Sequence, residues 1–164
     1  MTVPTILVRG NLVQDKDAIP IEKIVSWVKT RMPEYGSVRG DIANRVIAIR
    51  ARTGSGKSTV LPVALFRVLR SSKVPPHVRY RGASVLCTQP RVLTAISLAH
   101  DVASRPWNPD MVLDLTVGYV TGPQQRAPMR GLIYATAGVL AVLLGANDDA
   151  AIMDRYRFIV FDEA

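Results

Sequence analysis

A glycine-rich run between two largely apolar stretches has the composition of a loop that binds polyphosphate. Residues 51–59 read Ala-Arg-Thr-Gly-Ser-Gly-Lys-Ser-Thr, and the apolar stretches are residues 46–49 and 60–69. Such a loop requires the order strand, glycine-rich turn and helix, because glycine lets backbone N–H groups face the anion. The N-terminal end of the following helix favours the same negative charge. An ordinary connecting turn would use similar residues, but the flanking pattern favours the phosphate loop.

The residue types in this loop predict separate tasks. We expect Lys57 to reach the β- and γ-phosphates and to act in catalysis, and the Ser58 hydroxyl to bind Mg²⁺. The strict pattern begins with glycine, whereas this chain has Ala51 at that position. The residues predicted to bind the nucleotide are Thr53, Gly54, Ser55, Gly56, Lys57, Ser58 and Thr59.

Two adjacent acids follow an apolar run near the end of the sequence. The run 158–161 is Phe-Ile-Val-Phe, and Asp162 and Glu163 come directly after it. A site for Mg²⁺ and ATP needs acids of this kind opposite its phosphate loop. We expect Asp162 to hold the metal through water and Glu163 to orient or deprotonate the attacking water. Paired acids after a strand are also common helix caps, but the phosphate loop favours the catalytic interpretation.

The order of the apolar segments predicts an α/β domain with a mainly parallel sheet. Strands separated by helices form such sheets, and ligands bind at the carboxyl ends of the strands. The expected strands cover residues 46–49, 83–88, 112–120 with a break near Asp114, 132–135 and 157–161. The expected helices run from residue 21 to about 32, from the loop to about 69, from 92 to about 104, and over 139–144. We therefore divide the chain into an N-terminal helical extension, residues 1–40, and a nucleotide-binding domain, residues 41–164.

The charge distribution favours a polyanionic partner. The formal net charge of the 164 residues is +8, and no Asp or Glu occurs from residue 42 to residue 100. A basic surface beside a phosphate loop indicates nucleic acid. A solvated face that aids solubility is the alternative, and some of these cations could serve the nucleotide alone.

The remaining composition indicates where such a protein works. No uninterrupted apolar run reaches the roughly 18 residues of a membrane span, so we expect no membrane partner. Cys87 is the single cysteine and is expected to be a small buried strand residue, with no disulfide. These features predict an intracellular protein of the cytoplasm or nucleus.

Three segments together resemble the motifs of a known family. Residues 51–59 and 161–164 resemble motifs I and II of superfamily 2 helicases, in which alanine is usual at the first loop position. Residues 88–91, Thr-Gln-Pro-Arg, are similar to motif Ia of the DEAH/DExH-box group. Residues 118–122 resemble the stretch before motif Ib, and the segment 136–138, Thr-Ala-Gly, matches the family pattern only at Thr136 and Gly138. The resemblance covers residues 44–164.

The resemblance implies a fold and an activity. The fold would be the first RecA-like domain of a helicase, a three-layer P-loop NTPase domain that binds ATP or another NTP with Mg²⁺. In the intact protein, NTP hydrolysis would drive translocation along, or unwinding of, single-stranded RNA or DNA. The residues that the resemblance places on the nucleic acid are Pro90, Arg91, Thr121, Gly122 and Thr136.

Three points limit this expectation. The chain shows no glutamine motif upstream of the loop, so the resemblance does not select ATP among the NTPs. The sequence ends at Ala164, before the fourth residue of motif II, and the second RecA-like domain that supplies arginines to the γ-phosphate is missing from it. Alone, the chain is therefore expected to hydrolyse NTP weakly or not at all. A non-helicase P-loop NTPase and a truncated, non-catalytic protein that binds nucleotide or nucleic acid remain alternatives, and the divergent motifs leave room for a viral source.

Overall fold

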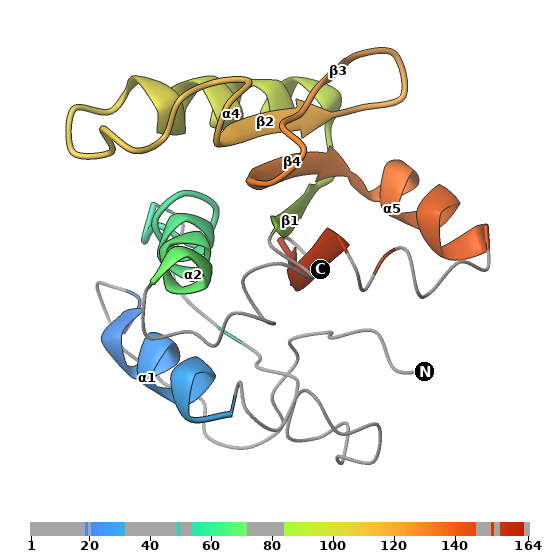
Figure 1. Ribbon diagram of the computed structural model, residues 1–164. Helices are drawn as coiled ribbons and strands as arrows, with labels where there is room; N and C mark the ends of the chain where they lie inside the picture. Colours follow the sequence, from blue (N-terminus) through green and yellow to red (C-terminus); the bar gives the residue numbers. More distant parts are fainter. Residues whose placement is uncertain are drawn as a thin grey trace.

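The computed structural model describes residues 19, 21–31, 49, 54–71, 84–146, 152 and 155–162 (Figure 1). Most of the predicted strand 46–49 lies outside these ranges, as do Ala51, Thr53, Glu163 and Ala164. The helices and strands are α1 Ile21–Arg31, α2 Val60–Arg70, β1 Ser84–Gln89, α4 Val92–Ser104, β2 Val117–Val120, β3 Gln125–Arg126, β4 Leu132–Thr136, α5 Ala137–Gly145 and β5 Tyr156–Phe161.

The described strands form one five-stranded sheet in the order β3-β2-β4-β1-β5. Strand β1 is parallel to both of its neighbours, β4 and β5, and β2 is parallel to β4. Only the short edge strand β3 runs antiparallel, against β2. All six residues of β1 are buried, as expected for a central parallel strand covered on both faces. The predicted mainly parallel sheet is confirmed.

Helices cover both faces of this sheet, which gives the three layers predicted. Side chains alternate along β1, so that Val85 and Cys87 enter one apolar cluster and Leu86 enters the other. The first cluster contains residues of α1, α2 and α4, and the second contains Leu140 of α5. The helical interpretation of residues 21–32 is confirmed by α1, which packs against α2 through the first cluster.

The local sequence explains how α2 and α4 begin and pack. Thr59 is the N-cap of α2, and Pro62 lies in its first turn, where a missing N–H breaks no intrahelical hydrogen bond. In α4 the buried residues Ala95, Ala99 and Val102 recur at helical spacing and face the sheet. Because small alanine side chains lie at this contact, α4 can approach the sheet closely.

The predicted strand over residues 112–120 is a regular strand, β2, only from Val117, and the expected break near Asp114 is confirmed. Before β2, Leu113 makes a single β-bridge to Val117, and residues 114–116 form a turn. The Thr116 hydroxyl accepts the N–H of Val112 at 2.7 Å and donates to the carbonyl of Asp110 at 2.7 Å. Asp114 has a φ of 67°, in the left-handed region that ends a strand. Local side-chain hydrogen bonds therefore limit strand pairing here to the single bridge of Leu113.

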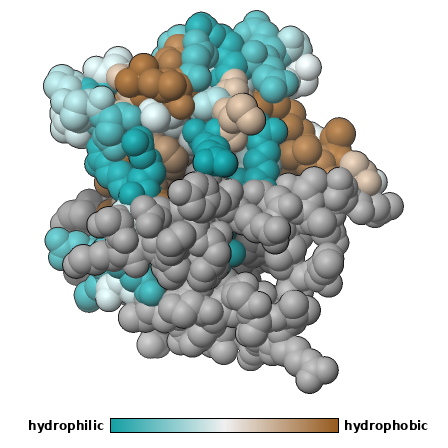
Figure 2. Space-filling view, viewed as in Figure 1, coloured by the Kyte–Doolittle hydropathy of each residue, from teal (hydrophilic) through white to brown (hydrophobic). Residues whose placement is uncertain are grey.

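Helix α5 is apolar around most of its circumference. It starts at Ala137, two residues earlier than expected, and of its residues Leu140 is buried while Val142 is 72% exposed. Figure 2 shows apolar side chains gathered at the right of the view, where α5 lies in Figure 1. Even so, no helix of the described part of the chain has the length and apolar character needed to span a bilayer.

Candidate active site

The phosphate loop owes its shape to two glycines. Gly54 and Gly56 have φ angles of 81° and 90°, which side-chain-bearing residues rarely adopt. A Cβ atom on Gly56 would lie 2.7 Å from Cγ2 of Val60, so space also excludes a side chain there. The Gly56 carbonyl accepts the N–H groups of Thr59, Val60 and Leu61 at 3.3, 2.8 and 3.0 Å. The loop therefore turns directly into the first turn of α2, as the motif predicts.

The loop and the predicted metal-binding acid meet at one edge of the sheet. Asp162 follows the carboxyl end of β5, and β1, the neighbour of β5, ends at Gln89. The Ser58 hydroxyl donates a hydrogen bond to Oδ2 of Asp162. The amide nitrogen of Gln89 donates to the same oxygen at 2.8 Å. The structure thus brings together Ser58 and Asp162, which are 104 positions apart in the sequence.

The oxygen atoms of this cluster fit a Mg²⁺ ion that binds together with a nucleotide. Mg²⁺ prefers hard oxygen ligands and usually takes one or two from the protein, with the rest from phosphates and water. Ser58 and Asp162 supply a hydroxyl and a carboxylate in direct contact. Among the described residues, no group of three or more His, Cys, Asp or Glu side chains could enclose a metal on its own. The assignment of Ser58 and Asp162 as metal ligands remains a prediction.

Two buried side chains of the central strands, Tyr134 and Cys87, contact residues of this site. The Tyr134 hydroxyl donates to the Ser58 carbonyl at 2.6 Å, and burial raises the pKa of this phenol well above its usual value. Cys87 is fully buried, as predicted, and burial followed by the nearby Asp162 charge raises the pKa of its thiol. Both groups are therefore uncharged at neutral pH. Sequence reasoning gave Tyr134 no role. It included Gln89 only in the segment that is similar to motif Ia and did not predict its contact with Asp162.

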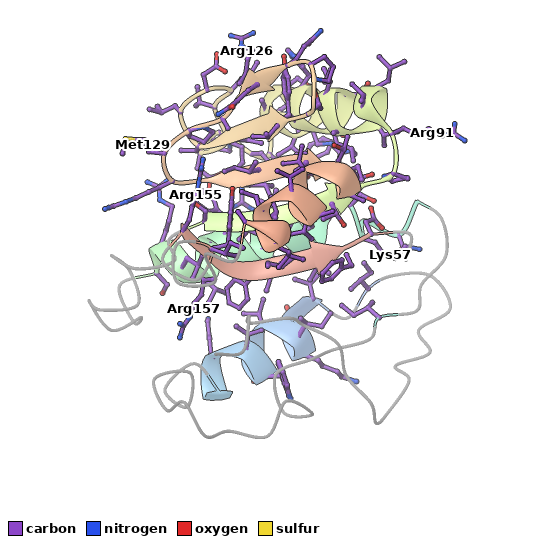
Figure 3. The ribbon with its side chains drawn as sticks, turned by 90° about the vertical axis from the view of Figure 1, so that its right-hand side faces the viewer. Lys57, Arg91, Arg126, Met129, Arg155 and Arg157 are labelled. Carbon is purple, nitrogen blue, oxygen red and sulfur yellow. The ribbon has the colours of Figure 1, made fainter. Side chains whose placement is uncertain are left out.

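Two of the segments predicted to touch nucleic acid are neighbours at this same edge. Pro90 and Arg91 follow β1, are exposed, and lead into α4, whose N-cap is Arg91. Thr136 ends β4 and is the N-cap of α5, and its hydroxyl makes no capping hydrogen bond. Gln89 pairs in register with Thr136. Figure 3 shows Lys57 and Arg91 at one side of the molecule, and Arg155 and Met129 at the opposite side.

The third predicted segment follows the next strand along the sheet. Thr121 comes after β2, which pairs with β4 through Val120 and Ala135. The Thr121 hydroxyl donates to the Gln124 carbonyl at 2.9 Å and accepts the Gln124 N–H at 3.1 Å, so it holds the turn into β3. Gly122, beside it, is exposed. The nucleic-acid roles of Thr121 and Gly122 remain predictions, and the structure adds a turn-forming role for Thr121.

A glycine loop leading into a helix, an acid after a parallel strand and helices on both faces of the sheet define a RecA-like P-loop domain. The profile of one family, described as DEAD/DEAH box helicase, matches residues 37–164. The chain belongs to the DEAD/DEAH box helicase family.

Individual relatives carry helicase names. The African swine fever virus protein B962L (isolate Pig/Kenya/KEN-50/1950), which bears an RNA helicase name, is 50% identical over 169 positions that include all of this chain. Spindle-E of Drosophila persimilis, named as an ATP-dependent RNA helicase, is 35% identical over 73% of the chain. The DExH-box ATP-dependent RNA helicase DExH2 of Arabidopsis thaliana is 29% identical over 72% of it. The chain spans 18%, 8% and 7% of the lengths of these three proteins.

Proposed function

We propose that this chain is the NTP-binding domain of an RNA helicase, in which hydrolysis of Mg²⁺-bound ATP drives movement along single-stranded RNA. The contact between Ser58 of the phosphate loop and Asp162, which follows β5, carries the proposal, because it brings together the hydroxyl and the carboxylate that a Mg²⁺–nucleotide site needs. The names of the relatives support ATP as the nucleotide and RNA as the polymer. The viral relative and the single buried Cys87 support an intracellular, viral setting.

Each residue of the proposed site has a separate task in binding or hydrolysing the nucleotide. The N–H groups of the loop between Gly54 and Thr59 bind the phosphates, and Lys57 neutralises charge on the β- and γ-phosphates. Ser58 and Asp162 hold Mg²⁺, which when bound stabilises the charge that develops on the transferred phosphoryl group. Glu163, outside the described residues, orients the attacking water.

The single strand binds along the edge where β1, β4 and β2 end. The N-terminal turns of α4 and α5 offer backbone N–H groups to phosphates, and Arg91 adds a positive charge there. Such contacts read the phosphate backbone and not the bases, as a motor that moves along any sequence requires. Phosphate contacts release counterions, so we expect RNA affinity to fall as salt rises.

The rest of the motor lies beyond residues 41–164, the domain that we assign. We propose that a second RecA-like domain completes the site with arginines and closes over the RNA. Residues of this kind raise the rate of phosphoryl transfer by roughly 10³–10⁵ where it has been quantified. Hydrolysis by the 164-residue chain alone is therefore expected to be close to background.

Binding experiments on this chain test the proposal directly. We expect it to bind a uridine decamer, with affinity falling on the order of tenfold between 50 and 200 mM salt if three phosphates are contacted. Arg91→Ala should weaken RNA binding, whereas Arg155→Ala, an equal change of charge at the opposite side, should not (Figure 3). Nucleotide binding without salt-sensitive RNA binding would instead favour a P-loop NTPase that is not a helicase.

Hydrolysis is tested in a longer protein that adds the following domain. We expect single-stranded RNA to stimulate its ATPase rate, and Lys57→Ala and Glu163→Gln each to abolish the stimulated rate. If function in cells survives both substitutions, the chain acts by binding alone.

A further inference from the structure

We propose that Gln89 is a positioning residue that couples RNA binding to the binding of the Mg²⁺–nucleotide complex. The inference rests on the proposed function, because it requires that the chain bind both RNA and the Mg²⁺–nucleotide complex. Gln89 is the last residue of β1 and is 2% exposed. Its amide nitrogen donates to Oδ2 of Asp162, and the residues that follow it are the exposed Pro90 and Arg91.

The hydrogen bond to Asp162 fixes the orientation of the Gln89 amide. An ionised carboxylate is only an acceptor, so the amide must direct its nitrogen and not its oxygen toward Asp162. The Ser58 hydroxyl donates to the same carboxylate oxygen. A carboxylate has about four acceptor positions, so these two donors leave capacity for a metal-bound water. Gln89 therefore sets the direction in which Asp162 presents its remaining lone pairs.

The backbone that follows Gln89, at Pro90 and Arg91, is stiff. A displacement of the N-terminus of α4 therefore also moves Gln89. Pro90 fixes its own φ and restricts the preceding residue to extended conformations. Gln89 is accordingly held in β1, in register with Thr136 of β4. Arg91 is the N-cap residue of α4. A phosphate that binds at this N-terminus therefore displaces residues 89–91 together, as one rigid segment. A shift of that segment moves the amide that holds Asp162.

The environment of the contact makes it sensitive to small shifts. Cys87, two residues earlier on β1, is buried with a raised thiol pKa, and its sulfur lies 3.7 Å from the Gln89 amide nitrogen. A neutral sulfur is a weak acceptor, so it replaces little of the interaction if the amide leaves Asp162. RNA thus acts on the hydrogen bond through Gln89, and nucleotide acts on it through Asp162. If RNA raises the affinity for nucleotide, nucleotide must raise the affinity for RNA by the same factor.

The test measures the affinity of the 164-residue chain for a non-hydrolysable ATP analogue with Mg²⁺, with and without a saturating uridine decamer. For the parent chain we expect RNA to tighten nucleotide binding by about fivefold or more, the lower range of typical allosteric coupling. Gln89→Met keeps the length of the side chain but removes its donor. We expect this variant to bind nucleotide more weakly even without RNA, because Asp162 loses the donor that orients it. The ratio of the nucleotide affinities with and without RNA should fall to near one.

Matched variants separate coupling from a structural role. Gln125→Leu removes an exposed glutamine of β3, far along the sheet, and should keep the coupling ratio of the parent. Gln89→Leu provides a second variant without the donor if thermal unfolding shows that Gln89→Met does not fold. It should also lose the coupling, because a leucine side chain cannot donate a hydrogen bond to Asp162.

Three results would contradict the role of Gln89, and a fourth would contradict the proposed function. A coupling ratio in Gln89→Met equal to that of the parent would overturn the inference, as would a uniform loss of nucleotide affinity with the ratio intact. So would a parent chain that binds both ligands independently. Absence of salt-sensitive RNA binding by the parent would instead contradict the proposed function itself.

Discussion

The phenolic hydroxyl of Tyr134 donates a 2.6 Å hydrogen bond to the main-chain carbonyl of Ser58. Tyr134 lies at the middle of β4, and Ser58 lies between the loop glycines and the start of α2. This contact supports the phosphate loop from the core of the sheet, through a group that burial keeps uncharged. The loop is thus held by the same strand whose end carries Thr136.

Removal of that hydroxyl should loosen the loop without changing the core. For Tyr134→Phe we expect a loss of about 1 kcal/mol in the free energy of unfolding, the usual net value of one hydrogen bond. Nucleotide affinity should fall a few-fold, because the loop is less preorganised. Urea denaturation and nucleotide titration measure the two effects. Tyr119→Phe, on β2 beside His100, is the control, and an equal loss of affinity there would contradict the explanation.

The two loop glycines should differ in their tolerance of alanine. At Gly54 an added Cβ would meet no atom. Gly54→Ala should therefore lower the free energy of unfolding only through the strain of its positive φ, by about 1 kcal/mol. At Gly56 the same strain adds to a contact of 2.7 Å with Val60, so we expect a loss above about 2 kcal/mol and no nucleotide binding. Gly138→Ala, in open space with an ordinary φ, should change stability by less than about 0.5 kcal/mol. Similar losses for Gly54→Ala and Gly56→Ala, measured in urea, would rule out the steric argument.

The ion pair between α2 and the turn after α4 should make stability depend on pH. Arg67 donates to both carboxylate oxygens of Asp110, at 3.0 and 2.6 Å, and these hydrogen bonds lower the pKa of Asp110. A lowered folded-state pKa means that the contribution is complete above the unfolded pKa, about 4, and disappears as pH falls through the folded value. Because the pair is substantially exposed, Asp110→Asn should cost only about 0.5 kcal/mol at pH 7. The difference from the parent should vanish in strong acid, and a difference that grew as pH fell would refute this account.

The buried thiol of Cys87 should report on unfolding. Burial, and then the charge of Asp162, raise its pKa, so the native thiol neither ionises nor meets reagent. Ellman's reagent at pH 8 should therefore react only as fast as the chain unfolds, and nucleotide with Mg²⁺ should slow the reaction. The raised pKa also implies that native stability declines above about pH 8.5, where the unfolded thiol ionises and the native one does not. Immediate labelling of the native chain would contradict the burial of Cys87. The Cys87→Ala variant, which has no thiol, is the control for background reaction.

The sequence predicted those parts of the fold that depend on local pattern. The apolar runs marked β1, β4 and β5 to within a residue or two, and the spacing of Ala95, Ala99 and Val102 marked α4. The phosphate loop was recognisable because its chemistry requires specific residue types. Asp162 was recognisable by its position after an apolar strand.

Features that depend on neighbouring strands could not be predicted in this way. The contact of Gln89 with Asp162 exists because β1 and β5 are adjacent, which no local pattern encodes. The turns before Val117 depend on the hydroxyl of Thr116, which competes locally with strand pairing. The two-residue strand β3 is too short to produce an alternating pattern.

The wide sequence separation within the site has a consequence for synthesis. Asp162 lies 104 positions after Ser58 and 73 after Gln89, and both contacts need β5 in place. Chains emerge from the ribosome N-terminus first, so the phosphate loop is made long before the acid that completes it. If the chain binds nucleotide as we propose, Asp162 can add its contact to the metal–nucleotide complex only after β5 has paired with β1. The stabilisation that depends on Asp162 is therefore absent from folding intermediates in which β5 is unpaired.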